Sequence, residues 1–341
     1  MKSTMFKAVL LAGCASVGFA SVAMAAPGDT KVSGRIYADF SVIDQKTDGV
    51  KTDASGTGFD VKRFYVGIDH QFDDIFSVNV TTDFNYVSND SETQVYVKKA
   101  FLQAKFSDAL TVRVGSADLP WVPFVEGVYG YRYVENVLPD RQHFGTSADY
   151  GVHVLGKFAD GMISYQGSVI NGAGYKKLTR SNAVDFEGRI SANPIMGLYL
   201  GVGGYSGKLG KDLENSPAMH TATRLDALVA YKTDQFTIGG EYMQAKNWNQ
   251  VTSVAEDKAE GYSVFGSFNF DPKAAVFARY DFTKPSKYLN NALKDDYFNV
   301  GVSYDPVKGV SIALVYKYDK KRDDETSTKT NEFGVWLKGR F

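Results

Sequence analysis

The sequence predicts an all-β protein, a 16-stranded antiparallel transmembrane β-barrel with an inward-folded third external loop. Three observations indicate this fold: apolar and polar residues alternate along most of the chain, short and long connections alternate between these segments, and the chain begins like a secreted protein. The 341 residues carry a formal net charge of -1 and a mean hydropathy of -0.24, which suits strands with one polar face. This near-neutral charge gives no indication of nucleic-acid binding, and we expect none.

Residues 1–25 have the composition of a cleaved signal peptide. Lys2 and Lys7 give a basic start, residues 8–25 are small and apolar, and Ala23-Met24-Ala25 is a cleavage site. A transmembrane helix is less favoured, because no stop-transfer charges follow this segment. A lipoprotein signal at Cys14 would be very short and would leave the later cleavage site unused. We therefore expect a barrel domain over residues 26–341, without cysteine.

The alternation has a period of two residues, as in strands with one face in lipid. In residues 31–44, Val32, Ile36 and Phe40 share one face, and Arg35 and Asp39 lie on the other. About sixteen such segments of roughly 8–14 residues follow one another, which is the length of a tilted membrane strand. The last one reaches the C-terminus at Phe341.

The connections between these segments alternate in length. Seven are short and rich in Asp, Pro and Gly, as tight turns require: 73–75, 107–109, 159–161, 194–197, 233–235, 271–273 and 305–309. Eight are long: 47–58, 88–94, 117–148, 171–183, 207–219, 247–258, 284–294 and 320–329. Fifteen connections join sixteen strands, and an even strand number with short turns at one end is typical of bacterial outer-membrane barrels.

Aromatic residues flank the short turns, for example Phe72, Phe76, Phe106, Phe158 and Phe270. Their parity places most of them on the apolar face, where a ring of aromatics at one height would form an interfacial girdle. A soluble β-sandwich also shows alternation, but it does not require strictly alternating connection lengths or such a girdle. The membrane barrel is therefore the favoured fold.

The chain resembles the porin superfamily of Gram-negative outer membranes over essentially the whole mature region. The alternating C-terminal segment ending in Gly339-Arg340-Phe341 resembles the assembly signal of these proteins, with Phe341 as its last residue. Residues 63–67 and 112–115 are similar to strands of the phosphate-selective type, porins O and P. The resemblance implies an outer-membrane homotrimer with periplasmic termini, in contact with the lipid bilayer and lipopolysaccharide. It also implies passive diffusion of small hydrophilic solutes or ions through the lumen, with no cofactor.

The connection over residues 117–148 is the longest, and it follows the fifth strand, where the resemblance places the third external loop. It contains Asp118, Glu126, Tyr131, Arg132 and Glu135 among many aromatic and charged residues. Connections this long are usually functional or disordered, and its aromatic content argues against disorder. We interpret it as a constriction loop, with an external cap or a trimer contact as the alternative.

Inward parity assigns Arg35, Arg63, Lys99 and Arg113 to a basic pore wall, because charges on the lipid face would cost up to about 2–4 kcal/mol each. We expect Asp118, Glu126 and Glu135 to face these bases, so that a transverse field filters solutes by charge. A slight excess of bases on the wall favours anions. Alternation fixes the face but not the height of a residue, so these charges could instead solvate a wide vestibule.

The sequence gives no sign of an enzyme, and we expect none. His70, His143, His153 and His220 lie outside the G-x-S-x-G and H-E-x-x-H motifs, and they are too scattered for a metal site. The glycine-rich run over residues 201–207 predicts close packing or a subunit contact rather than a nucleotide site. The alternatives to a channel are an outer-membrane barrel hydrolase and a structural or adhesin barrel.

Overall fold

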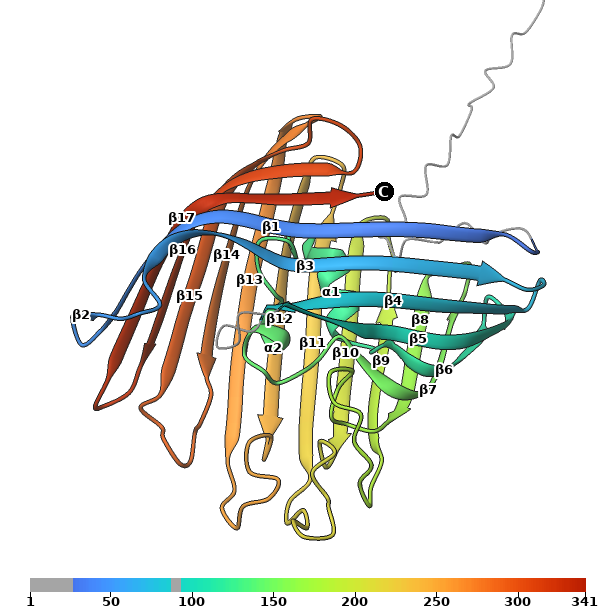
Figure 1. Cartoon of the computed structure of the whole chain (residues 1–341), viewed down its shortest axis with the longest axis horizontal. Helices are drawn as coiled ribbons and strands as arrows, with labels where there is room; N and C mark the ends of the chain where they lie inside the picture. The colour runs from blue at the N-terminus through green and yellow to red at the C-terminus, as the bar shows by residue number, and fades with distance from the viewer. Residues whose placement is uncertain (1–26, 87–92) are drawn as a thin grey trace, which may run out of the picture.

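The computed structural model describes residues 27–86 and 93–341. The expected signal peptide and most of the connection expected at 88–94 lie outside these residues. The described chain forms sixteen long antiparallel strands and one two-residue strand, which together make a barrel (Figure 1). None of the helices in the described part is long and apolar enough to cross a membrane.

The strands follow one another around the barrel in sequence order. They are β1 (Thr30–Thr47), β2 (Val50–Lys51), β3 (Gly56–Gln71), β4 (Phe76–Tyr86), β5 (Thr93–Ser107), β6 (Leu110–Asp118), β7 (Ala148–Phe158), β8 (Ile163–Ile170), β9 (Asp185–Ala192), β10 (Leu198–Gly207), β11 (Ala222–Lys232), β12 (Phe236–Lys246), β13 (Lys258–Asp271), β14 (Ala274–Lys284), β15 (Lys294–Tyr304), β16 (Val310–Arg322) and β17 (Ser327–Arg340).

The barrel is closed by pairing of the first and last strands. β1 pairs with β3 on one side and with β17 on the other, where Arg35 lies opposite Arg340 and Thr47 opposite Thr328. Closure leaves no strand edge with unpaired backbone groups, which a bilayer would not tolerate. The predicted 16-stranded antiparallel barrel is therefore confirmed.

Side chains alternate between an apolar outer face and a polar inner face. In β1, Ile36 and Phe40 are exposed on the outside, whereas Tyr37, Asp39 and Ser41 are buried on the inside. The same alternation continues through β9 to β17, where inward Asp, Glu, Arg and Ser side chains are largely buried. This pattern matches the parity expected from the sequence.

Two of the connections expected to be long are partly built into strands. β16 continues to Arg322 and β17 begins at Ser327, so only residues 323–326 remain as a turn. The Asp323 carboxylate closes this turn by accepting hydrogen bonds from the backbone amides of Glu325 and Thr326. The prediction of a long connection at 320–329 was wrong, because polar residues beyond the membrane still extend the ladder. Similarly, β2 pairs with the end of β1 inside the connection expected at 47–58.

The longest connection runs from residue 119 to 147 and contains two short helices, α1 (Val122–Tyr129) and α2 (Leu138–Arg141). A proline lies in the first turn of each helix, where its missing N–H costs nothing. α1 ends at Gly130, whose φ of 82° is the left-handed cap that glycine adopts readily. Asp118, expected inside this connection, instead ends β6, where it pairs with Ala148 of β7.

Candidate functional site

The connection 119–147 is attached to the inner faces of β9–β16, which we call the covered wall. Trp121 is fully buried there. Its Nε1 donates to Glu241 Oε1 at 2.8 Å, and its backbone amide donates to Glu187 Oε1 at 3.1 Å. Gly201 and Gly203 make room for this contact, since a Cβ at either position would lie 2.6 Å or 2.5 Å from the Phe124 or Trp121 ring. The glycine-rich run in β10 therefore serves close packing.

Three arginines of the covered wall bind the main chain of this connection. Arg189 Nε donates to Pro120 O at 2.9 Å, Arg224 Nη1 to Phe144 O at 2.7 Å, and Arg279 Nη1 to Asn136 O at 2.6 Å. All three arginines are buried on the inner face. Alternation alone gives no sign that the backbone of a loop would accept their hydrogen bonds. Their charge holds the connection in place and is not free to face solvent.

Arg141 makes the densest ionic contact between the connection and the covered wall. Its guanidinium lies 3.0 Å from Asp281 Oδ2, 2.7 Å from Asp295 Oδ1 and 3.3 Å from Asp319 Oδ2, on β14, β15 and β16. A planar guanidinium with five N–H donors can bind several carboxylates at once. It therefore fixes α2 against three neighbouring strands.

The predicted loop residues Tyr131 and Glu135 also contact the covered wall. The Tyr131 ring stacks on Phe277 of β14 with 4.0 Å between centroids, and its hydroxyl lies 3.4 Å from Ser303 Oγ. Glu135 Oε2 lies 3.4 Å from Lys317 Nζ of β16. Burial alone would raise the pKa of Glu135, but the positive charges of Lys317 and Arg141 outweigh it and lower this pKa to about 2.

Glu126 and Arg132, predicted to line the constriction, pair with each other within the connection. Arg132 Nη2 also lies 3.5 Å from Asp140 Oδ2. The connection reaches β1 through Tyr133, whose ring centroid is 6.3 Å from that of Tyr37. Glu126 and Glu135 thus both have basic partners other than the four bases expected to face them.

The four predicted wall bases lie on β1, β3, β5 and β6, which with β4 form what we call the basic wall. Lys99 Nζ lies 3.1 Å from Asp118 Oδ2, so the structure brings this one predicted pair together. Arg63 instead pairs with Asp83 of β4 at 3.2 Å. Arg113 donates to Gln103 at 2.8 Å, and Arg35 donates to the Tyr37 hydroxyl at 3.4 Å.

Sequence reasoning missed two lysines of the basic wall, Lys62 and Lys98. Lys62 Nζ lies 3.3 Å from the inward Asp39, and Lys98 Nζ donates to the Tyr65 hydroxyl at 3.3 Å. A signal was present, because Val61 and Val97 share the parity of Arg63 and Lys99 although they are apolar. Such a break in the phase of the alternation indicates an extra residue in the strand.

Phe341 pairs with the start of β1. Its backbone amide donates to Gly34 O at 3.1 Å, and the Gly34 amide donates to Phe341 O at 3.1 Å. The Phe341 ring lies over Gly34, where a Cβ would be 2.2 Å from it and would push the ring aside. Phe341 is 84% exposed on the barrel surface.

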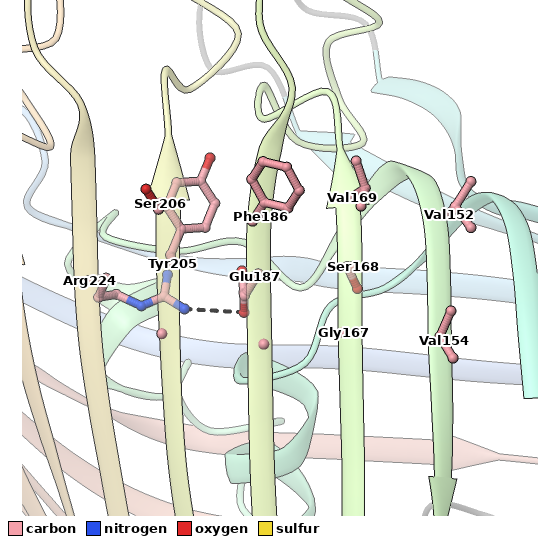
Figure 2. Close-up of a pocket in the computed structure, with 12 residues that line it drawn as sticks. Val152, Val154, Gly167, Ser168, Val169, Phe186, Glu187, Tyr205, Ser206 and Arg224 are labelled. Carbon is pink, nitrogen blue, oxygen red and sulfur yellow. Dashed lines mark hydrogen bonds and ion pairs between the residues drawn. The ribbon is translucent and has the colours of Figure 1, made fainter. Parts of the chain in front are cut away.

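A groove of about 570 Å³ lies over β7–β11 (Figure 2). Its outer lining includes Val152, Val169 and Phe186, which are exposed on the apolar face, so this part of the groove faces away from the lumen. The Arg224–Glu187 ion pair drawn in Figure 2 belongs to the inner face, where both side chains are buried. Within residues 27–86 and 93–341, no group of three or more His, Cys, Asp or Glu could hold a metal ion.

The family model for Gram-negative porins matches residues 9–324 of the sequence. The chain belongs to this family. No curated protein matches the sequence of this porin. Membership makes the barrel an outer-membrane diffusion channel, as predicted. The narrower likeness to phosphate-selective porins stays a prediction.

Solved structures share the fold of the porin at low sequence identity. The outer-membrane channel DcaP of Acinetobacter baumannii is 14% identical, with a TM-score of 0.67 over 95% of this chain and 99% of that one. The anion-selective porin of Comamonas acidovorans is 11% identical, with a TM-score of 0.63 over 92% of this chain and 100% of that one. The trimer form of OmpT, an outer-membrane protein of Vibrio cholerae, is 13% identical, with a TM-score of 0.62 over 92% of this chain and 100% of that one.

Proposed function

We propose that this porin is an anion-preferring homotrimeric channel without enzymatic activity, narrowed by residues 119–147. The main support is that the bases and the acids of the basic wall differ in how many of them form ion pairs. Within residues 27–86 and 93–341, Arg35, Lys98 and Arg113 take part in none of the ion pairs, whereas the inward acids Asp39, Asp83 and Asp118 each have one. Two further inward acids lie there: Asp60, which pairs with Lys62, and Asp69, which accepts a hydrogen bond from Asn79. The basic wall therefore keeps an excess of positive charge.

The covered wall supports the same preference by leaving few free acids. Arg141 binds Asp281, Asp295 and Asp319, and Arg224 binds Glu187 and Asp226. A narrow, weakly screened passage with net positive charge on one side raises the local concentration of anions. The anion-selective porin of Comamonas acidovorans, with a similar fold, agrees with this preference.

Further parts of this proposal concern export and assembly. Residues 1–25 would be removed as a signal peptide, Phe341 would serve as the assembly signal, and the outer face would contact lipid and lipopolysaccharide. The trimer form of OmpT supports three copies per assembly. In this arrangement, Glu126, Tyr131, Arg132 and Glu135 surround the narrow part of the passage opposite the basic wall. Asp118 lies on the basic wall itself, beside Lys99.

The test is single-channel recording in a planar bilayer across a KCl gradient. We expect stable openings in groups of three and a reversal potential whose sign reports chloride preference. Arg113→Gln should move the reversal potential towards that of potassium, and Lys308→Gln, in an exposed turn, should leave it unchanged. Potassium preference in the unmodified channel would overturn the proposed selectivity, and folded protein without conductance would overturn the open channel.

A further inference from the structure

Two long strands of the basic wall contain an extra residue away from any turn. In the β1–β3 pair, Tyr37 lies opposite Arg63 but Ala38 lies opposite Val61, so Lys62 has no partner in the ladder. In the β4–β5 pair, Thr81 lies opposite Lys99 but Thr82 lies opposite Val97, so Lys98 has none. Both positions are β-bulges, which re-aim side chains.

The two bulges occur in the same local sequence, a valine followed by two bases. Regular alternation would point Lys62 and Lys98 to the face opposite Arg63 and Lys99, which is the lipid face. A lysine near the bilayer midplane costs up to about 2–4 kcal/mol on that face. The bulges remove this conflict between sequence and alternation, because they change the phase of the strand by one residue.

The contacts of the two lysines place them on the inner side. Lys62 Nζ lies 3.3 Å from Asp39 and 2.9 Å from Asp60, and Asp39 is buried on the inner face. Lys98 Nζ donates to Tyr65 and lies 4.7 Å from the centroid of that ring and 5.5 Å from that of Tyr175. Val61 and Val97, one residue earlier, are 37% and 40% exposed on the outer face.

We propose that the two bulges place Lys62 and Lys98 on the channel side, and that both lysines determine the charge selectivity of the pore. The inference rests on the proposed channel function and deepens its anion preference. Lys98 has the larger effect, because it is buried among tyrosine rings and screened less by salt. Lys62 has a smaller effect, since its side chain is 40% exposed beside two carboxylates.

The orientation can be tested by cysteine substitution and a charged, membrane-impermeant methanethiosulfonate reagent. The sequence contains one cysteine, Cys14, so the variants are made in a Cys14→Ser background. We expect Lys62→Cys and Lys98→Cys to react and to change the single-channel conductance. Val61→Cys and Val97→Cys should not react in lipid. Reaction at the two valine positions without reaction at the lysine positions would show regular strands and overturn the proposal.

The selectivity is tested with Lys98→Gln, Lys62→Gln and Lys51→Gln, the last in the exposed strand β2. Lys98→Gln should lower the chloride-to-potassium permeability ratio by about twofold or more, Lys62→Gln by less, and Lys51→Gln not measurably. Lys98→Arg should keep the chloride-to-potassium permeability ratio of the unmodified channel. This control shows that the change in Lys98→Gln comes from the lost charge and not from substitution at position 98 as such. A Lys98→Gln channel with the same ratio as Lys51→Gln would overturn the assignment of Lys98.

These outcomes separate this inference from the proposed function. Potassium preference in the unmodified channel, together with a further shift to potassium in Lys98→Gln, would reject the anion preference and keep the bulge assignment. Chloride preference in the unmodified channel, without any shift in Lys98→Gln, would keep the anion preference and reject the role of Lys98 in selectivity.

Discussion

The basic wall and the covered wall have the same strand architecture but use their inward charges differently. On the covered wall, Arg189, Arg224 and Arg279 donate to backbone carbonyls of residues 119–147. On the basic wall, Arg35, Lys98 and Arg113 bind tyrosine or glutamine groups instead. A charged side chain in a barrel therefore either anchors a loop or faces the passage, and its partner decides which.

The largest expected effect comes from freeing the loop at Trp121. Trp121→Ala removes a fully buried indole and leaves Glu241 without its donor, at a cost of about 3–5 kcal/mol. We expect a larger and noisier single-channel conductance, because residues near 121 would leave the covered wall. Trp121→Phe keeps most of the packing and should give an intermediate conductance. An unchanged conductance in Trp121→Ala would show that this contact does not set the pore size.

An intermediate effect is expected from protonating Glu135. Its folded-state pKa of about 2 lies below the ordinary value of 4.5, so its pairing with Lys317 stabilises the loop fully above pH 4.5. That stabilisation is lost as the pH falls through about 2. Current noise should therefore rise between pH 4.5 and 2, and Glu135→Gln should show the higher noise already at neutral pH. Equal noise in both proteins across this range would exclude Glu135 as an anchor.

The smallest effect is expected at the Tyr131 hydroxyl. Tyr131→Phe removes a 3.4 Å contact with Ser303 and keeps the ring stacked on Phe277, which should cost about 0.5–1 kcal/mol or less. Conductance should stay close to that of the unmodified channel. Tyr131→Ala also loses the stacking and should increase the conductance more clearly. A larger change in Tyr131→Phe than in Tyr131→Ala would contradict this order.

Much of the barrel could be predicted from the sequence, because alternation reports which face of a strand meets lipid. The inward positions of Arg35, Arg63, Lys99 and Arg113 followed from this rule alone. The rule failed at Lys62 and Lys98, where an extra residue shifts the phase of the strand. It also failed at residues 320–329, where strands continue beyond the membrane without an apolar face to mark them.

The sequence by itself determined the strand number, the closed fold and the inner face, since each depends on a period of two along the chain. Only the tertiary structure decided the partners of Glu126 and Glu135, because residues 119–147 have no period and their path depends on contacts far away in sequence. The same contacts decided that Arg224 anchors the loop and that Arg113 does not. The proposed charge selectivity depends on these long-range pairings, which the local sequence pattern cannot encode.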